Sequence, residues 1–326
     1  MLDLPEDWVW DFWVVDDPDS DPVVGTGSYH LFFLKAPRAL GDPELRHRNA
    51  SVGHAVSTDL RHWTRVADAL APQVSPAFDD LATWTGCVVR GDDGVWRMFS
   101  TGLSRAEDGL VQRIGLSTSD DLLTWRRNPE PVLVADGRWY TTFQPGTAGP
   151  EEAWRDPWVV RDDAGGWHLY ATAHVVGGTG AAVAHATSED LVTWEVRPPL
   201  SGPSSRFVWA EVISLVEVDG RWALLFSCLS DQMPHDEPGS GGVWSVPVDG
   251  PGAPVDLSRA VRLTSEDLYV GKVVPLRGGG HRFLAFANRD EDGRFPGGVI
   301  DPCEVTWNDE GTALRLGGDV PARWLP

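Results

Sequence analysis

Lysine is nearly absent from this sequence of 326 residues, which contains only Lys35 and Lys272. The remaining basic residues are scattered arginines, and the formal net charge is −21. Binding to nucleic acid or to an anionic membrane surface depends on clustered lysine and arginine side chains that neutralise phosphate groups. The charge therefore argues against both partners and leaves a small molecule as the expected ligand.

Cysteine and long apolar segments are also scarce. Cys87, Cys228 and Cys303 lie far apart, with the spacing of neither a disulfide framework nor a metal site. No apolar run approaches the roughly 20 residues of a membrane-spanning helix. Residues 1–10 lack the basic and apolar regions of a secretory signal. These absences predict a soluble, acidic, cytoplasmic protein.

Helical periodicity is hard to find, and a repeated segment takes its place. GHAVSTDLRHW (53–63), GLSTSDDLLTW (115–125) and AHATSEDLVTW (184–194) align with one another, and their final tryptophans are 62 and 69 residues apart. Weaker versions occur at 241–249 and 297–307. Self-similarity with a period of this size is typical of repeat architectures.

Each copy also contains two apolar runs joined by a turn, which is polar and rich in Asp and Gly in most copies. The second runs lie at 29–35, 96–101, 167–172, 222–227 and 282–287. Strand, turn, strand, loop and a strand with a terminal Trp describe an antiparallel meander. Five meanders, each too small to bury its own faces, predict an all-β fold: a five-bladed β-propeller of four-stranded antiparallel blades, forming a single catalytic domain over 1–326. A β-sandwich does not explain five copies, and a parallel β-helix requires a much shorter repeat.

Carboxylates recur at one place in these copies. Counting back eleven residues from the second run reaches Thr85, Asp156, Glu211 and Gly271 in copies two to five. Asp11, inside the otherwise apolar stretch VWDFWVVDD, corresponds to them in the first copy. Because the first strand of each propeller blade lines the central axis, these positions are predicted to face one axial cavity.

An unpaired carboxylate in an apolar strand is costly to bury. Taken singly, each of the three is explained as well by a turn, a cap or an ion pair; Asp156, between Arg155 and Pro157, fits a local turn. Taken together, three carboxylates in one cavity repel one another and raise the pKa of at least one. A protonated carboxyl beside an ionised one is the arrangement that glycoside hydrolysis requires.

Four motifs carry a resemblance to known enzymes. VWDFW (9–13) and WTGCV (84–88) resemble the V-W-D-[ST]-W and W-S-G-S motifs of glycoside hydrolase family 68, the levansucrases. WRDPWV (154–159) is similar to the R-D-P motif that family 68 shares with family 32, the invertases, inulinases and levanases. VGHAVSTDLRHW (52–63) resembles the W-G-H-A-x-S-x-D-L-x-H-W segment of family 32. The motif order agrees over roughly residues 8–230.

The resemblance implies a retaining glycoside hydrolase or fructosyltransferase that acts on β-fructofuranosides such as sucrose or short fructo-oligosaccharides. By it, Asp11 is the nucleophile, Asp156 stabilises the transition state with Arg155 beside it, and Glu211 is the general acid and base. The sequence departs from family 32 at Val212, where that family has cysteine. Five blades also use the whole chain, which predicts a compact outlier without the C-terminal β-sandwich of that family.

Eight residues are predicted to bind the saccharide: Trp10, Trp13, His54, Trp84, Thr85, Arg155, Trp209 and Lys272. Aromatic rings suit the apolar faces of a sugar, although core packing explains the tryptophans as well. His54 has packing as its alternative. Lys272, beside the Gly271 position, is predicted as an inward cation that balances the acidic cavity, with solvent exposure as the alternative.

No cofactor and no metal site are predicted. The acidic cluster DDPDSD (16–21) leaves a structural calcium open, but its spacing is not that of an EF-hand, and it is typical of a solvated turn. Asp59, Asp121 and Asp190 of the repeats are predicted to cap turns, with their tryptophans packing between blades. Two alternatives to the enzyme stay open: an inverting, family-43-like arabinofuranosidase or xylosidase, and a non-catalytic carbohydrate-binding propeller.

Overall fold

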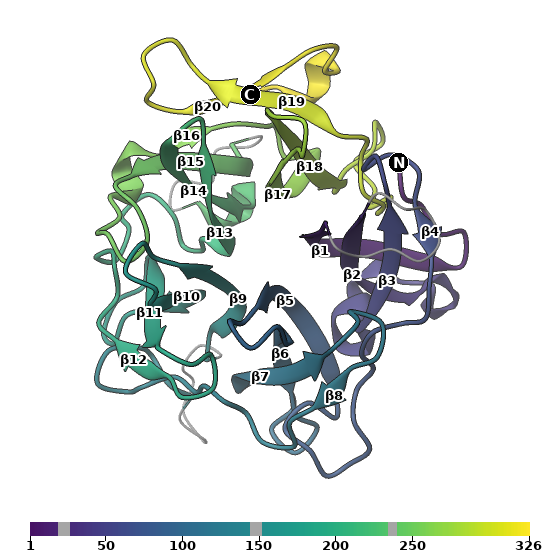
Figure 1. Ribbon diagram of the computed structural model, residues 1–326, viewed down its shortest axis with the longest axis vertical. Coiled ribbons are helices and arrows are strands. Elements are labelled where there is room, and N and C mark those ends of the chain that lie inside the picture. Colours follow the sequence, from purple (N-terminus) through teal and green to yellow (C-terminus); the bar gives the residue numbers. More distant parts are fainter. Residues whose placement is uncertain (19–26, 144–151, 234–239) are drawn as a thin grey trace.

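Five four-stranded sheets stand around a central axis in a computed structural model that describes residues 1–18, 27–143, 152–233 and 240–326 (Figure 1). Each sheet is an antiparallel meander of strands that are consecutive in sequence. The first strand of each sheet lies innermost, and the fourth lies at the rim (Figure 1). The predicted five-bladed β-propeller is confirmed.

The strands of each blade follow one another along the chain. Blade one contains β1 (Asp7–Asp17), β2 (Ser28–Pro37), β3 (Ser51–Ser57) and β4 (Thr64–Arg65). Blade two contains β5 (Ala82–Arg90), β6 (Trp96–Leu103), β7 (Gln112–Ser119) and β8 (Arg126–Arg127). Blade three contains β9 (Trp154–Arg161), β10 (Trp167–His174), β11 (Ala181–Ser188) and β12 (Glu195–Arg197). Blade four contains β13 (Glu211–Val218), β14 (Arg221–Cys228), β15 (Gly242–Val248) and β16 (Val261–Arg262). Blade five contains β17 (Leu268–Pro275), β18 (His281–Ala287), β19 (Cys303–Trp307) and β20 (Leu314–Gly317).

Helical structure in the described residues is limited to short 3₁₀ turns. They are η1 (Arg38–Leu40), η2 (Pro43–Asn49), η3 (Ser230–Gln232), η4 (Leu257–Arg259) and η5 (Ala322–Trp324). No helix in the described part of the chain has the length and apolar character needed to cross a bilayer.

The repeated S-x-D-L-x-x-W segments form identical turns after the third strands of blades one to three. Asp59, Asp121 and Asp190 each accept two backbone N–H bonds, at 2.6–2.9 Å, from the residues two and three positions later. The leucine after each aspartate is buried and has a φ of 61–63°. The prediction that these aspartates cap turns is confirmed.

Two of the three repeat tryptophans, Trp125 and Trp194, pack between blades, as predicted. Trp125 of blade two meets Phe32 of blade one edge to face, with ring centroids 5.7 Å apart. Trp194 of blade three meets Phe99 of blade two in the same way at 5.4 Å. Blades two and three therefore each pack a repeat tryptophan against a phenylalanine of the blade before them.

The N-terminal segment closes the ring against blade five. Leu2 and Val299 exchange two backbone hydrogen bonds of 2.9 Å, and Gly298 donates from its backbone N–H to the Val9 carbonyl at 2.8 Å. The first and last blades therefore meet through backbone hydrogen bonds, and the innermost strands enclose the axis on all sides (Figure 1).

Candidate active site

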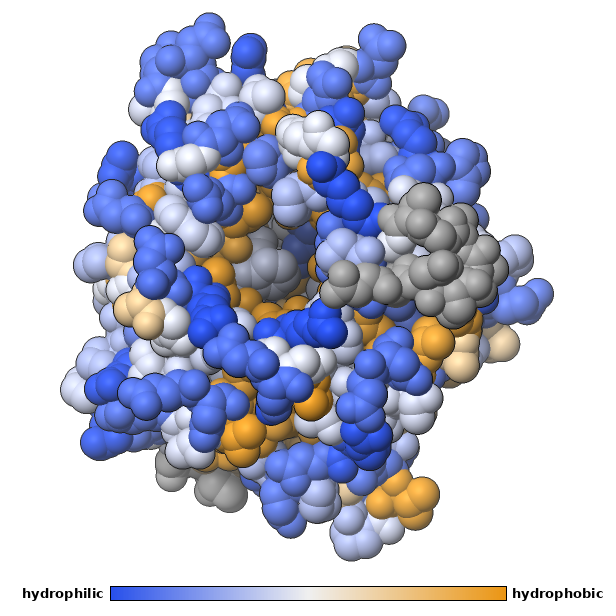
Figure 2. All heavy atoms as spheres, in the orientation of Figure 1, coloured by the Kyte–Doolittle hydropathy of each residue, from blue (hydrophilic) through white to orange (hydrophobic). Residues whose placement is uncertain are grey.

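A cavity of about 820 Å³ lies where the innermost strands begin, and residues of all five blades line it. The centre of the ring is hollowed on the face that Figure 2 shows. Asp11, Asp156 and Glu211 all line the cavity, from blades one, three and four. The sequence prediction that three carboxylates from different blades share one axial cavity is therefore confirmed.

Each innermost strand contains a β-bulge, and in blades one to four a residue of the bulge lines the cavity. In blade one, Trp10 pairs with Leu34 and Phe12 with Phe33, so Asp11 is the extra residue. Thr85 is the extra residue of blade two. A bulge re-aims one side chain without ending the strand, which explains how a carboxylate leaves an apolar strand toward the axis. Asp156 lies in the bulge of blade three with a φ of 58°.

Glu211 is displaced by one residue from the position that the sequence count assigned to it. Val218 pairs directly with Arg221, so only two residues form the turn of blade four, whereas three residues form it in blades two and three. Counting back eleven residues across the shorter turn therefore goes one residue too far and reaches Glu211 instead of Val212. Val212, with a φ of 52°, is the equivalent of Asp156.

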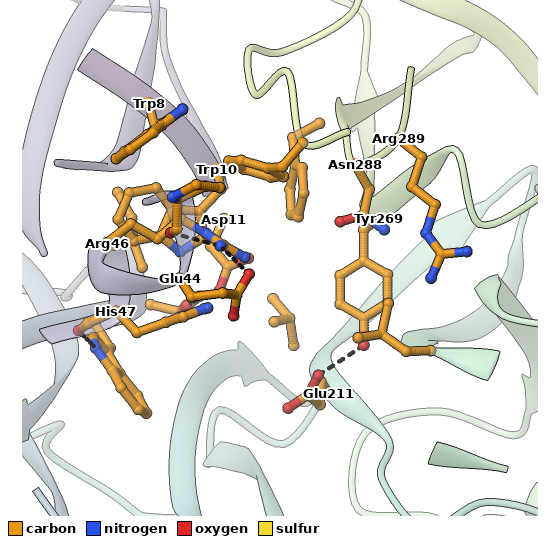
Figure 3. Close-up of a pocket in the computed structure, with 18 of the residues that line it drawn as sticks. Trp8, Trp10, Asp11, Glu44, Arg46, His47, Glu211, Tyr269, Asn288 and Arg289 are labelled. Atoms are coloured by element: carbon orange, nitrogen blue, oxygen red, sulfur yellow. Dashed lines mark hydrogen bonds and ion pairs between the residues drawn. The ribbon is translucent and has the colours of Figure 1, made fainter. Parts of the chain in front are cut away.

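The prediction of one shared register was therefore wrong for Glu211. Its equivalents, each paired just before the bulge, are Arg155 in blade three and Tyr269 in blade five. The three side chains form one cluster. Arg155 donates from Nη2 to Glu211 Oε1 at 2.8 Å, and the Tyr269 hydroxyl donates to Glu211 Oε2 at 2.7 Å (Figure 3).

Asp11 lines the cavity and accepts a direct hydrogen bond from a neighbouring blade. The Thr85 hydroxyl donates to Asp11 Oδ2. Burial, and then the charge of Asp156, raises the pKa of Asp11 to about 7, although the Thr85 hydrogen bond opposes the rise. The free site can therefore hold a proton on this carboxyl near neutral pH.

Asp156 is more enclosed and better supported. The Thr172 hydroxyl donates to Asp156 Oδ2 at 3.0 Å, the Val212 backbone N–H donates to the same oxygen at 3.3 Å, and Arg155 Nε lies 3.6 Å from it. Burial raises the pKa of Asp156, and the adjacent Arg155 guanidinium opposes that rise. Asp156 is therefore held by groups on three strands, which are β9, β10 and β13.

The eight predicted saccharide-binding residues divide into three groups. Trp10, Trp84, Thr85 and Arg155 line the cavity. Trp209 lies behind Arg155, whose guanidinium is 4.5 Å from the centre of its ring. The other members do not line the cavity: Trp13, His54 and Lys272.

Trp13 and His54 pack in the core of blade one instead of reaching the site. Trp13 is 1% exposed and stacks on Phe32, with ring centroids 6.0 Å apart. His54 is fully buried, stacks on Phe32 with ring centroids 4.2 Å apart, and shares a 3.0 Å contact with His30. For Trp13 and His54, core packing is therefore the correct interpretation, and the prediction that they bind the saccharide is wrong.

Two walls of the cavity come from segments that carry no repeat signal. The turn η2 contributes Glu44, Arg46 and His47, and the segment after β18 contributes Asn288 and Arg289 (Figure 3). Burial, and then the neighbouring Arg46, lowers the pKa of His47 to about 4. Its imidazole is therefore neutral above pH 5 and acts as an uncharged wall.

No group of three or more His, Cys, Asp or Glu side chains suited to a metal ion occurs within the described ranges. The acidic cluster 16–21, considered above for calcium, lies mostly outside them. In its described part, Asp16 accepts a 2.9 Å hydrogen bond from Arg277 Nε. The absence of a cofactor stays a prediction.

The hydroxyl of Thr85 should tune the ionisation of Asp11. Thr85→Val removes the donor that stabilises the charged carboxylate, so the acidic limb of the kcat/KM profile should move up by roughly half a pH unit to one unit. Thr83→Val is the matched control, because Thr83 lies on the same strand and its buried hydroxyl has no hydrogen-bond partner in the structure. An unchanged acidic limb in Thr85→Val would contradict this role.

Asp11 should also lower the stability of the fold above neutral pH. The folded protein keeps this proton up to about pH 7, whereas an unfolded chain loses it near the ordinary value of 3.8. Folding therefore becomes less favourable as the pH rises between these values. Asp11→Asn should raise the Tm at pH 8 by about 2–4 °C, because cavity solvent screens part of the penalty. The gain should vanish near pH 4, and a gain of equal size at both pH values would contradict the assignment.

The geometry is suited to acid-assisted displacement at a sugar carbon. A carboxyl held by an arginine and a tyrosine faces the same cavity as two mutually repelling carboxylates. Such a set can donate a proton to a leaving oxygen, supply a nucleophile and stabilise positive charge on a sugar ring.

Relatives of known sequence match a large part of the chain. The β-fructofuranosidase insoluble isoenzyme CWINV5 of Arabidopsis thaliana is 31% identical over 213 residues, which are 63% of this chain and 33% of that protein. The β-fructofuranosidase insoluble isoenzyme 7 of Oryza sativa is 33% identical over 190 residues, which are 55% of this chain and 28% of that protein. The chain spans about a third of the length of the curated relatives it matches.

Solved structures share the fold over nearly the whole chain. The inulosucrase of Halalkalicoccus jeotgali, bound to kestose, superposes with a TM-score of 0.74 at 21% identity, covering 99% of this chain and 92% of that one. The Bacillus subtilis levansucrase gives 0.72 at 16% identity, covering 98% and 88%. The family 32 β-fructofuranosidase of Bombyx mori gives 0.68 at 18% identity, covering 97% and 64%.

The family is given by the sequence itself. The N-terminal domain of glycosyl hydrolases family 32 matches residues 13–242, which begin two residues after Asp11 and include Asp156 and Glu211. The match extends from blade one into the third strand of blade four. This chain therefore belongs to glycosyl hydrolases family 32.

Proposed function

We propose that the chain is a fructosyl hydrolase or transferase that cleaves β-fructofuranosides such as sucrose or short fructo-oligosaccharides with retention of configuration. The observation that carries the proposal is the meeting of Asp11, Asp156 and Glu211 in one cavity of a family 32 propeller. In the proposal, these are the nucleophile, the transition-state stabiliser and the general acid and base. Trp10 and Trp84 supply apolar faces for the sugar.

The first displacement forms an ester on the enzyme. Asp11 Oδ attacks the anomeric carbon of the fructosyl unit, and the bond from that carbon to the glycosidic oxygen breaks. Glu211 donates its proton to the departing oxygen. Asp156 accepts hydrogen bonds from hydroxyl groups of the sugar and stabilises the positive charge that develops on the ring.

The second displacement releases fructose. Glu211, now ionised, removes a proton from a water molecule or from the hydroxyl of an acceptor sugar. The resulting oxygen attacks the same carbon, and the Asp11 carboxylate leaves. Arg155 and Tyr269 donate hydrogen bonds to Glu211 and so hold its carboxyl group in place.

The substrate class rests on the relatives. Those matched in sequence include β-fructofuranosidases and a fructan 6-exohydrolase, and solved neighbours include complexes with sucrose and with 1-kestose. Family 32 membership removes the basis of the family-43-like alternative. Three carboxyl groups in one cavity favour an enzyme over a non-catalytic sugar-binding propeller.

A substrate screen tests the proposal. The protein should release fructose from sucrose, raffinose or 1-kestose, and be inactive on aryl arabinofuranosides and xylosides. Levan and inulin separate hydrolysis of long chains from hydrolysis of short ones. Binding of 1-kestose without turnover would favour the binding propeller, and activity confined to the aryl pentosides would contradict a fructosyl enzyme.

A further inference from the structure

Lys272 is a buried ammonium group beside the active site but outside its cavity. The residue lies on β17 and is 3% exposed, and within the described ranges no carboxylate lies within ion-pair distance of its Nζ. A lysine without a direct counter-ion is costly to bury. Surrounding groups must therefore stabilise the positive charge of the Lys272 ammonium group.

Two direct contacts hold the ammonium group, and they belong to two other innermost strands. Nζ donates to the Val212 carbonyl of β13 at 3.4 Å. It also lies 4.5 Å from the centre of the Trp158 ring of β9, a favourable cation–π distance. Trp158 Nε1 donates in turn to the Leu215 carbonyl of β13 at 3.1 Å. Lys272 thus ties together the strands that carry Tyr269, Asp156 and Glu211.

Val212 connects this contact to the carboxylates. It has a φ of 52°, in the left-handed region that a β-branched residue rarely adopts. In this conformation its N–H donates to Asp156 Oδ2 at 3.3 Å, and its carbonyl accepts from Lys272. Because Val212 follows Glu211 directly, the N–H that donates to Asp156 belongs to the peptide group that joins Glu211 to Val212.

The charges that face Lys272 come from three strands. Asp11 of β1 and Asp156 of β9 are attractive once ionised, and Cys87 of β5 lies nearby as a buried thiol whose pKa is raised to about 12 by burial. Burial lowers the pKa of Lys272 to about 8, and the three groups oppose that shift. Below this value the ammonium form persists and attracts the negative charge of the two aspartates.

We propose that Lys272 is a positioning residue of the active site, which supplies a buried positive charge near Asp11 and Asp156 and holds the backbone of Val212, whose N–H supports Asp156. The inference rests on the proposed function for its consequence in catalysis, but not for the charge coupling itself. A positive charge at this place offsets part of the repulsion between the two carboxylates.

Removing the charge should displace the pH dependence of the reaction. Without the ammonium group, ionisation of Asp11 becomes harder, so the acidic limb of kcat/KM should move to higher pH by about one unit in Lys272→Met. Asp11 is also faced by Thr85, Asp156, Glu211 and Arg46, which this variant leaves in place. A loss of stability alone would reduce the amount of active protein without moving the limb.

The second lysine gives a matched control. Lys35 is paired with Asp68 at 3.0 Å and Asp7 at 3.4 Å and does not line the cavity. Lys35→Met should leave the acidic limb unchanged. An acidic limb in folded Lys272→Met equal to that of Lys35→Met would overturn the proposal.

A titration without substrate keeps the proposal testable if Lys272→Met does not fold. Because the chain has only two lysines, ¹³C-labelled lysine gives two side-chain NMR signals, and Lys35→Arg assigns them. Asp11→Asn and Asp156→Asn should each lower the pKa of Lys272, since coupling between two sites is reciprocal. An unchanged pKa in both variants would overturn the inference. A lowered pKa in a protein inactive on every fructoside would overturn only the proposed function.

Discussion

Asp11→Asn should lower kcat for sucrose by about 10⁴-fold or more while leaving sucrose binding within a few-fold of wild type. Asparagine keeps the size of the side chain and an oxygen that can accept the Thr85 hydrogen bond, but its amide is not a competent nucleophile. The site keeps its shape, because Asp11 is the single extra residue of a bulge whose flanking pairs stay formed. Initial rates and calorimetric binding of sucrose check this expectation.

A carboxylate on the same strand provides the control for this substitution. Asp16 lies near the far end of β1 and is ion-paired with Arg277, away from the cavity. Asp16→Asn should retain nearly full activity. Fructose release by Asp11→Asn at a rate close to that of Asp16→Asn would remove Asp11 from the reaction.

Glu211→Gln should reduce kcat on sucrose by about 10²- to 10⁴-fold, the usual share of general acid–base catalysis. Glutamine still accepts from Arg155 or Tyr269, so the cluster stays assembled. The loss should be much smaller for fructosyl fluoride in the first step, because fluoride leaves without a proton. Azide should then speed release of the fructosyl group, because it attacks without a general base.

Comparison of the two substrates, with and without azide, separates this role from a structural one. Glu217→Gln is the control, since Glu217 lies on the same strand with its side chain exposed to solvent. An equal loss on sucrose and on fructosyl fluoride, with no effect of azide, would contradict the acid and base role of Glu211.

The architecture was accessible from the sequence because its signals are local and repeated. The S-x-D-L-x-x-W turns depend on hydrogen bonds between residues within five positions of one another. Asp59 and its equivalents therefore predict these turns directly. The paired apolar runs then predict two strands of each blade. The short fourth strands, such as β4 and β8 with two residues each, carry no such signal.

The site was accessible only in part, because spatial register depends on turns and bulges that vary in length. The turn between the first two strands of blade four contains only Asp219 and Gly220, one residue fewer than in blades two and three. A count of eleven residues therefore reaches Glu211 instead of Val212. Glu211 still lines the same cavity, from the position just before the bulge. The count therefore reached a carboxylate of the cavity, but at a position one residue away from the shared register.

Tyr269, Arg46 and His47 were missed for different reasons. Tyr269 is an aromatic residue in an apolar strand, which sequence does not distinguish from a core residue, although its hydroxyl contacts Glu211. Arg46 and His47 lie on η2, in the connection between β2 and β3, which carries none of the repeated motifs. Conversely, tryptophan and histidine are common in sugar sites, but Trp13 and His54 pack in the core of blade one and do not line the cavity.

Formation of a fructosyl ester on Asp11 is tested most directly by trapping it. Glu211→Gln should be mixed with fructosyl fluoride, quenched with acid and digested with pepsin, and the peptides analysed by mass spectrometry. We expect the peptide that contains Asp11 to gain the mass of one fructosyl group, and Asp11→Asn to show no such gain. A fructosyl group found on Asp156, or no adduct while fluoride is still released in a burst, would contradict the double displacement through Asp11.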